Sequence, residues 1–429
     1  MRIVERAAVI GIYLVPAPDR ELRVGTLIRD KAGTVTFVVD DGYIAMGPRR
    51  PLVSLAWQGR SEEETVARLT NRGDKIMHGG LLPPFFENLL PEGALRELVA
   101  KEFGAGAFDN FDVLARLGQD LPGAVVARWE AGTLAPTTTG AIREDVEAIF
   151  AKRIHFSLAG VQLKFSMTMK QGSLTLLPAK DSEGEIILKT PARHYDRVPE
   201  AEYTALKLAE AVGVRVVDAW LVGADQIDGV PKEFLPSGAM SLAVRRFDRH
   251  ANNRRTQIED FAQILGAVGN QKYTKGNEAT VMNIVHRFSA DPRGELLEAV
   301  RRIVVNILLG NGDAHLKNWS FLYPDAGDIA LSPAYDLVPT FLYGDDEMAL
   351  PLGNNKNPYT VGLRRFERAA GLLKVEPKVL VKEVKSTVEN AMDTWPGLLE
   401  DLPLTDEANR AIIDRLYKLQ LAGEIRDKT

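Results

Sequence analysis

The residues on either side of Gly310 constrain the fold of this chain more than any other segment. Before it, apolar residues recur at helical spacing and predict a buried helix, at Leu297, Val300, Val304 and Leu308. After it comes the polar loop Asn311-Gly-Asp-Ala-His-Leu-Lys-Asn318. A helix anchored in a core holds the start of this loop rigidly, and the four residues between Asp313 and Asn318 let both side chains point into one cleft. The segment therefore predicts a helical domain that presents a rigid polar loop.

A second acidic residue, Asp336, follows the loop within Ser332-Pro-Ala-Tyr-Asp-Leu337. Protein-kinase-like enzymes transfer a phosphoryl group with an Asp, an Asn five positions later and a further Asp. The first Asp orients the proton of the nucleophile, and the other two residues hold metal against the nucleotide phosphates. A Gly-Asp turn with an Asn cap explains the loop equally well, so the rest of the chain has to decide between the two interpretations.

Length and composition predict a globular protein and exclude several kinds of site. The chain has 429 residues, 45% hydrophobic and 26% charged, which predicts two or three domains with a substantial core. Because it has no cysteine, disulfides, thiol catalysis and cysteine-bound zinc are excluded, and its six histidines are scattered without an HExxH pair. A net charge of −5 gives no overall attraction for nucleic acid, although a local basic patch stays open.

The N-terminus admits two interpretations. Two arginines precede the apolar run 7–15, which loosely imitates a signal peptide. The run also pairs naturally with residues 22–28 across the turn Pro16-Ala-Pro-Asp-Arg20, so a β-hairpin is favoured. No stretch of the sequence has the roughly 18–20 apolar residues that a membrane span needs. We expect a cytoplasmic protein without membrane contact.

The order of the predicted elements indicates an α+β chain with two kinase-like lobes. Strands are predicted at 7–15, 22–28, 34–39, 52–56, 163–169, 185–190 and 241–247, and a helix at 199–211. A segment rich in Thr, Pro and Gly, 132–140, resembles a linker, and the chain is mostly helical after about residue 258. We therefore expect a β-rich module plus helices over 1–135, a part like a kinase N-lobe over 150–255, and a helical C-lobe with the catalytic loop over 256–429.

Lys189 ends the apolar strand Glu185-Ile-Ile-Leu-Lys189, a position from which kinases grip nucleotide phosphates. Glu202 lies near the apolar face of the following helix, where a buried carboxylate needs a cation, so a Lys189–Glu202 pair is one interpretation. The alternatives are a lysine that points into water from an edge strand and a first-turn glutamate that interacts with the helix dipole.

The segment Ser157-Leu-Ala-Gly-Val-Gln-Leu-Lys164 is a candidate phosphate loop. A small residue and Gly160 allow a tight turn whose N–H groups could cradle phosphates. The segment lacks the GxGxxG and Walker patterns, and an ordinary β-turn explains it when it is taken alone.

Together these motifs resemble the HipA family of bacterial toxin kinases. The matching segments cover nearly the whole chain in order: Arg23-Val-Gly-Thr-Leu27, Arg50-Pro-Leu-Val-Ser-Leu55, Phe85-Phe-Glu-Asn-Leu-Leu-Pro-Glu92, Ser157–Lys164, Ile187-Leu-Lys189, Ala201-Glu-Tyr203, Leu242–Arg249, Glu259-Asp260, Asn311–Asn318 and Tyr335-Asp336. The resemblance implies a bilobal, HipA-type kinase fold and a serine/threonine protein kinase that uses ATP and Mg²⁺.

The resemblance also implies a role for each matching residue. Asp313 would be the catalytic base, Asn318 and Asp336 would bind magnesium, and Lys189, partnered by Glu202, would contact the phosphates. The resemblance implies that ATP contacts Lys189, the hinge residues Arg245 and Phe247, and also His315 and Tyr335. In the phosphate loop, the implied contacts are Ser157, Ala159, Gly160, Val161, Gln162, Leu163 and Lys164. Ser157 matches a serine that the family autophosphorylates, which ejects the loop and stops activity.

The chain departs from the best-known family pattern at three positions. Leu163 and Arg245 stand where Glu is common, and Ile258 stands where a nucleotide-contacting Gln is common. The hinge meets adenine through its backbone, so Arg245 leaves that contact intact, whereas the contact at Ile258 is in doubt.

The resemblance implies several partners, and two alternative functions remain open. The implied partners are a HipB-like helix-turn-helix antitoxin, operator DNA reached only through that antitoxin, and a bacterial protein substrate, for which an aminoacyl-tRNA synthetase is one candidate. The alternatives are a small-molecule kinase of the aminoglycoside or choline phosphotransferase type and an inert co-repressor scaffold. The Ser157 loop and the N-terminal module argue against the first, and the complete set of Asp313, Asn318 and Asp336 argues against the second.

Overall fold

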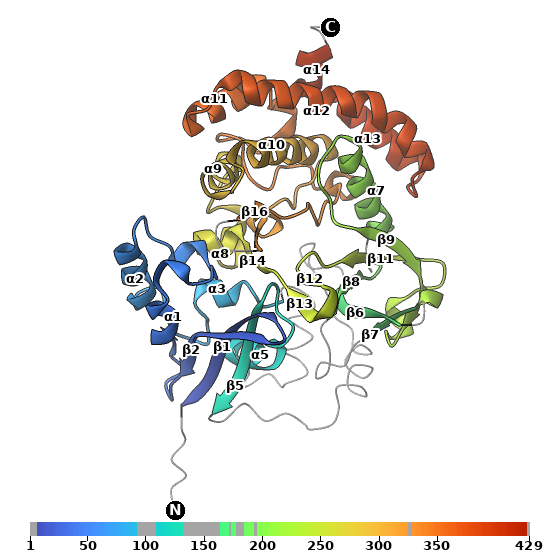
Figure 1. Cartoon of the computed structure of the whole chain (residues 1–429). Helices are drawn as coiled ribbons and strands as arrows, with labels where there is room; N and C mark the ends of the chain where they lie inside the picture. The colour runs from blue at the N-terminus through green and yellow to red at the C-terminus, as the bar shows by residue number, and fades with distance from the viewer. Residues whose placement is uncertain are drawn as a thin grey trace, which may run out of the picture.

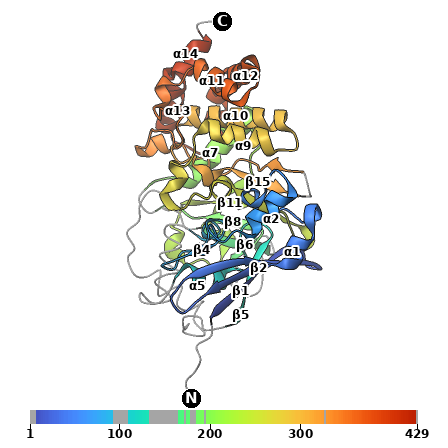
Figure 2. The same ribbon diagram turned by 90° about the vertical axis from the view of Figure 1, so that its left-hand side faces the viewer.

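The protein folds into two sheet-containing regions beneath a helical region (Figures 1 and 2). The fold is described from a computed structural model, in which residues 7–91, 109–131, 164–170, 173–176, 184–192, 195–324 and 328–426 are described. The N-terminal sheet and the second sheet lie side by side at the bottom of Figure 1, and the C-terminal helices lie at the top. The α+β architecture agrees with the prediction. Within the described residues, no helix combines the length and apolar character that crossing a membrane requires.

The N-terminal sheet is antiparallel and has the strand order β4-β3-β2-β1-β5. Its strands are β1 (Ala8–Ala17), β2 (Arg20–Arg29), β3 (Val35–Val39), β4 (Ile76–Met77) and β5 (Val125–Ala131). The helices beside it are α1 (Asp41–Ala45), α2 (Glu62–Thr70), α3 (Pro84–Glu87) and α5 (Asn110–Leu117). The predicted hairpin at the N-terminus is confirmed, with β1 and β2 paired along their length.

The predicted strand at 52–56 is wrong. A 3₁₀ helix, Leu55–Trp57, stands there instead. The Ser54 side chain accepts a hydrogen bond from the Ala56 N–H at 3.1 Å, which gives the backbone a local partner in place of a neighbouring strand. Leu55 and Trp57 are both buried. Apolar residues at i and i+2 thus predict a strand wrongly when a capping residue such as Ser54 precedes them.

The second sheet has the order β10-β7-β6-β8-β11-β9. Its strands are β6 (Lys164–Lys170), β7 (Ser173–Leu176), β8 (Ile186–Lys189), β9 (Ala219–Gly223), β10 (Ile227–Asp228) and β11 (Met240–Arg245). Helix α7 (Val198–Ala211) agrees with the prediction and packs on this sheet. The register places Lys164 opposite Lys189, so two lysines arrive side by side at one end of the sheet.

The helical region surrounds one long buried helix. Its helices are α8 (Phe261–Leu265), α9 (Glu278–Phe288), α10 (Pro292–Leu309), α11 (Leu363–Leu373), α12 (Pro377–Leu398), α13 (Asp406–Lys418) and α14 (Gln420–Arg426). A small sheet beneath them joins β14 (Gln257–Asp260), β15 (Ser320–Tyr323) and β16 (Ala330–Leu331), and a hairpin joins β12 (Arg249–His250) to β13 (Arg254–Arg255). The strand β14 and this hairpin were not predicted.

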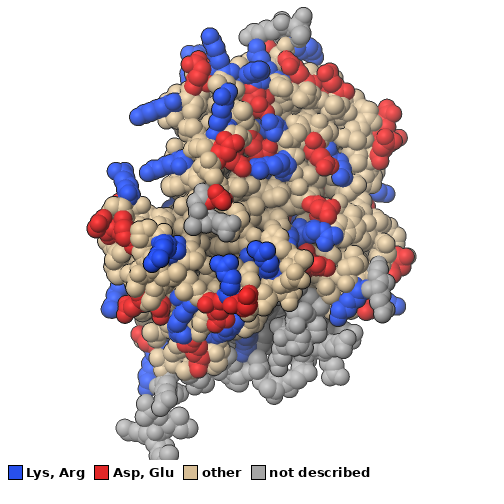
Figure 3. Space-filling view, in the orientation of Figure 1, with Lys and Arg blue, Asp and Glu red and all other residues tan. Residues whose placement is uncertain are grey.

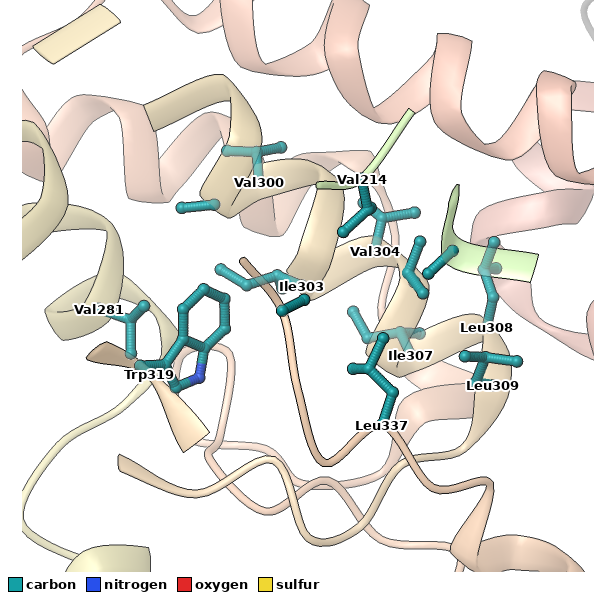
Figure 4. Packing of buried hydrophobic residues seen from close by; sticks show 14 of the residues in the cluster. Val214, Val281, Val300, Ile303, Val304, Ile307, Leu308, Leu309, Trp319 and Leu337 are labelled. Carbon is teal, nitrogen blue, oxygen red and sulfur yellow. The ribbon is translucent and has the colours of Figure 1, made fainter. Parts of the chain in front are cut away.

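Helix α10 is the centre of the largest core, as the apolar spacing predicted. Val300, Ile303 and Val304 pack against Val281, Trp319 and Leu337 from neighbouring segments (Figure 4). The helix is buried on nearly all sides, which is typical of a helix inside a core rather than on a surface. It ends at Gly310, whose φ of 64° is left-handed and suits glycine. The polar loop therefore starts from one of the most firmly held points of the fold.

Buried polar contacts join the N-terminal region to the other two. Glu259 on β14 is fully buried and accepts hydrogen bonds from the Ser54 hydroxyl, from the Leu55 N–H at 2.8 Å and from the Tyr323 hydroxyl at 2.6 Å. Asp120, between α5 and β5, accepts from Arg246 at 2.7 Å and from Ser166 on β6 at 2.7 Å. The three regions are thus tied together around the end of the second sheet.

Candidate active site

The loop that follows α10 is held in place by hydrogen bonds to its backbone. The Gly312 N–H donates to the Thr340 hydroxyl at 2.7 Å, and that hydroxyl donates to the carbonyl of Gly310 at 3.0 Å. From the other side, the buried guanidinium of Arg415 on α13 donates to the carbonyl of Ile307 at 3.2 Å. These contacts fix both the end of the helix and the first residues of the loop.

Within the loop, the backbone turns back on Asp313. The His315 N–H donates to the Asp313 carbonyl at 2.8 Å, and the Asn318 N–H donates to the His315 carbonyl at 2.9 Å. The amide nitrogen of Asn318 also donates to the Asp313 carbonyl, at 2.7 Å. The two residues that the sequence singled out five positions apart are therefore joined by a direct hydrogen bond.

The Asp313 carboxylate has a partner that the sequence did not reveal. The Tyr273 hydroxyl donates to its Oδ1 at 2.5 Å, and the Nε2 of His315 lies 3.7 Å from the same oxygen. The Asp313 side chain remains 41% exposed. Tyr273 comes from the short segment between α8 and α9, and a single tyrosine in such a segment carries no spacing signal that points to Asp313.

A second cluster of charges forms where the second sheet meets the helical region. The Lys189 ammonium lies 2.5 Å from a carboxylate oxygen of Glu202 and is also in contact with Asp336. The ammonium of Lys164 lies 3.1 Å from the other oxygen of Asp336. Two lysines and two acids from four separate segments thus meet at one point. Lys189 does not point into water from an edge strand, and Glu202 pairs with Lys189 rather than with the helix dipole alone.

The pKa shifts in this cluster follow from burial and pairing together. Burial raises the pKa of Glu202, and Lys189 opposes that shift only in part. Burial also disfavours the charged forms of Lys189 and Asp336, but the opposite charges outweigh it. The pKa of Lys189 is therefore raised, and Lys164 and Lys189 hold the pKa of Asp336 well below its usual range. Lys189 and Asp336 both stay charged at neutral pH.

Asp336 has an unusual backbone conformation. Its φ is 54°, in the left-handed region that residues other than glycine seldom occupy. Such a conformation costs on the order of 1 kcal/mol or more and persists where the surroundings impose it. The half-buried neighbour Tyr335 holds the segment before Asp336. Its hydroxyl donates to the Lys317 carbonyl at 2.8 Å and lies 2.6 Å from the Ser320 hydroxyl. The turn directs the Asp336 carboxylate towards the two lysines.

Asn318 and Asp336 line the same small cavity. The other lining residues are Arg302, Asn306, Asn311, Ala314, Trp319, Ala334, Tyr335 and Leu337. Because the amide nitrogen of Asn318 is used in donating to Asp313, its oxygen is the atom suited to a cation. One carboxylate and one amide oxygen fit Mg²⁺, which proteins bind through one or two such ligands together with substrate phosphates and water. In the described part of the chain, no group of three or more His, Cys, Asp or Glu side chains is suited to a metal.

The two residues predicted to form the hinge differ in how their side chains lie. Phe247 packs against Tyr335, with ring centroids 5.6 Å apart, and so contacts the segment that carries Asp336. The exposed Arg245 side chain turns away, to Asp218 at 3.0 Å and to the ring of Trp220. Its N–H donates to the Asp218 carbonyl at 2.8 Å. Most of the predicted phosphate loop, namely Ser157, Ala159, Gly160, Val161, Gln162 and Leu163, lies outside the described residues. Lys164 is the member of that segment whose contacts are described.

Two domain families match the chain. Residues 156–395 match the HipA-like C-terminal domain, and residues 20–128 match the HipA N-terminal domain. The first match alone covers more than half of the 429 residues. It also includes every residue discussed in the two charged clusters above.

Individual proteins match over most of their length. The protein named "Putative kinase Y4dM" from Sinorhizobium fredii is 36% identical over 391 residues, which are 89% of this chain and 91% of that protein. The serine/threonine-protein kinase toxin HipA from Shewanella oneidensis is 23% identical over 372 residues, 79% of this chain and 81% of that protein. A solved structure of Shewanella oneidensis HipA with HipB and operator DNA covers 97% of this chain and 99% of its own, with a TM-score of 0.70 and 20% identity. That structural match establishes the fold.

Proposed function

Because the chain belongs to the HipA family, we propose that it is an ATP-dependent serine/threonine protein kinase and the toxin of a HipA/HipB-like toxin–antitoxin pair. The observation that carries the proposal is the contact of Lys189 with both Glu202 and Asp336. Kinases of this kind need a lysine held by a glutamate and a metal-binding aspartate in place before they can transfer a phosphoryl group.

In the proposed reaction, Asp313 accepts the proton of a serine or threonine hydroxyl. The hydroxyl oxygen attacks the γ-phosphorus of ATP, the bond from that phosphorus to the β–γ bridging oxygen breaks, and ADP leaves. Lys189, kept charged by its two acidic partners, binds phosphate oxygens. Because Asp313 is 41% exposed and held by its backbone contacts, a substrate hydroxyl can reach it in a defined position.

We assign the metal role to Asn318 and Asp336. Mg²⁺ held there would supply the positive charge that neutralises the phosphates of ATP. Asp336 would then be shared between the cation and its two lysine partners, Lys164 and Lys189, whose ammonium groups would be available to phosphate oxygens. The backbone of Arg245 and Phe247 forms the adenine hinge in this proposal, and His315 and Tyr335 flank the nucleotide.

We also propose that Ser157 is the autophosphorylation site and that residues 157–164 form the phosphate loop. Phosphoserine carries roughly −1.5 to −2 charge at neutral pH and would repel ATP phosphates from the loop. The protein would then regulate its own activity. Mapping the phosphopeptides formed after incubation with ATP and Mg²⁺ tests this directly, and phosphate on residues other than Ser157 would refute it.

The proposed partners are a HipB-like antitoxin and a bacterial protein substrate, with an aminoacyl-tRNA synthetase as one candidate. Operator DNA would be reached through the antitoxin. On the face drawn in Figure 3, basic and acidic side chains are interspersed. The solved structure that matches in fold contains HipA together with HipB and operator DNA.

The test of the proposed function is Asp313→Asn. The variant should lose phosphate transfer from ATP while it keeps the thermal stability of the wild type, because the carboxylate is partly exposed and its backbone contacts remain. Transfer is measured as labelled phosphate on the chain and on proteins of a bacterial lysate, beside a panel of free hydroxyl metabolites. Undiminished transfer in the variant would remove Asp313 from the mechanism, and transfer to metabolites alone would favour a small-molecule kinase.

A further inference from the structure

Among the described residues, Tyr273 lies outside the predicted set and yet contacts Asp313 directly. It ends the 3₁₀ helix Gly269–Tyr273 in the connection between α8 and α9. Its hydroxyl donates to Oδ1 of Asp313 at 2.5 Å, a short contact that joins residues 40 positions apart in the chain. A phenol in this position touches the very group that is proposed to accept the substrate proton.

The tyrosine ring is itself held in place. It meets the His315 ring edge to face, with centroids 5.0 Å apart and planes at 80°. The ammonium of Lys272 lies 5.4 Å from the ring centroid. His315 belongs to the same loop as Asp313, so Tyr273 contacts that loop at two points. The position of the hydroxyl is therefore set by packing and not by its hydrogen bond alone.

An aspartate carboxylate that is held only by its backbone can rotate about its last torsion. That torsion is broad and roughly two-fold, so the two oxygens exchange places easily. Both described contacts of the Asp313 carboxylate, from Tyr273 and from His315, reach Oδ1. A donor fixed on one oxygen stops the rotation and directs the other oxygen towards an incoming hydroxyl.

We propose that Tyr273 is a positioning residue that holds Oδ1 of Asp313 and leaves Oδ2 to receive the proton of the substrate hydroxyl. The inference rests on the proposed role of Asp313. It assigns to Tyr273 a role in the transfer step and none in the binding of ATP. A tyrosine that only packs against His315 would affect stability but would leave the transfer step unchanged.

Tyr273→Phe separates these roles because it removes the hydroxyl and keeps the ring. The matched control is Tyr13→Phe, since the Tyr13 hydroxyl also donates to a carboxylate, Glu130 at 2.6 Å, but in the N-terminal sheet. Each variant is produced as the full chain. Autophosphorylation is followed with labelled ATP and Mg²⁺ at increasing ATP concentration, and ADP release into water is measured in the same samples.

We expect Tyr273→Phe to lower the maximal rate of autophosphorylation about tenfold, the effect of one lost charge-assisted hydrogen bond in the transfer step. The half-saturating ATP concentration and the melting temperature should stay near those of the wild type. The ratio of phosphate transferred to ATP hydrolysed should fall, because a rotating carboxylate selects less well between a hydroxyl and water. Tyr13→Phe should leave all of these quantities unchanged.

The outcomes distinguish this inference from the function on which it rests. A maximal rate and a transfer ratio equal to those of the wild type in Tyr273→Phe, while Asp313→Asn is inactive, would overturn the role of Tyr273 alone. A loss of rate that comes with a large rise in half-saturating ATP, or with a fall in melting temperature, would also overturn it in favour of a structural role. Phosphate transfer that persists in Asp313→Asn would overturn both.

Discussion

Replacing Glu202 with glutamine should separate catalysis from folding. Glu202 is 1% exposed, and one of its oxygens lies 2.5 Å from the Lys189 ammonium. In the described structure Lys189 also has Asp336, so the ammonium keeps an anionic partner when Glu202 loses its charge. With Asp336 shared with the proposed Mg²⁺, Glu202 would be the principal anion that holds Lys189 against the phosphates.

The size of the effect follows from the geometry of the pair. At 2.5 Å and an effective dielectric constant of about 20, the attraction between the two charges is about 7 kcal/mol. Part of this is offset by the cost of burying the carboxylate, which is visible in the raised pKa of Glu202. Glutamine also keeps an oxygen that can accept from Lys189. A net loss of about 2–3 kcal/mol remains, equivalent to roughly 30- to 150-fold in kcat/KM for ATP.

The assay is the steady-state rate of phosphate transfer at varied ATP, with Glu200→Gln as the matched control. Glu200 lies two residues before Glu202 on α7, is 6% exposed and has an ion-pair distance of 3.8 Å to Arg197. The control should keep wild-type kcat/KM. If Glu202→Gln stays within threefold of the wild type, or if both variants lose activity equally, the lysine does not depend on Glu202 and the reasoning fails.

Two further predictions concern the scaffold around the site. Burial raises the pKa of Glu259 to about 7 from 4.5, so its protonated form stabilises the fold below pH 4.5 and that contribution is lost as the pH rises through 7. Glu259→Gln should abolish this pH dependence. In urea unfolding, the difference in unfolding free energy between wild type and variant should change by about 3 kcal/mol between pH 4.5 and 8. Parallel curves of unfolding free energy against pH for the two proteins would contradict the assignment. Arg415→Met should lower stability by about 2 kcal/mol, because it leaves Asp346 and the Ile307 carbonyl without their cation, and should slow phosphate transfer by loosening the end of α10. Thermal unfolding and transfer rates measure this, and an unchanged melting temperature would speak against it.

The local elements of the fold could be predicted because neighbouring residues in the sequence specify them. Apolar spacing predicted α10, and a glycine at its end explains why the helix stops there. The β1–β2 hairpin and α7 followed from similar local patterns. The strand predicted at 52–56 failed because the Ser54 side chain satisfies the backbone locally, an effect that apolar spacing does not register.

Parts of the candidate site could not be predicted from the sequence because they depend on contacts between distant segments. Lys164 was expected in a phosphate loop, but its contact with Asp336 joins residues 172 positions apart. The bond from Tyr273 to Asp313 and the bond from Ser54 to Glu259 likewise require the folded chain, the second across 205 positions. None of these residues has a neighbour in the sequence that would mark it as a partner.

The sequence by itself determined the residue types of the chemistry: an aspartate and an asparagine on a loop after a buried helix, a second aspartate, and a lysine at the end of a strand. These features are local, since side-chain spacing and backbone preferences act over a few residues. The tertiary structure decided how those groups are charged and oriented. Partial burial of Asp336 between two lysines, and full burial of Glu202 against one of them, set the pKa shifts of these acids. The Tyr273 hydroxyl contacts one oxygen of Asp313. Electrostatic and hydrogen-bond energies depend on distance in space and on exclusion of water, and only the packed chain fixes both.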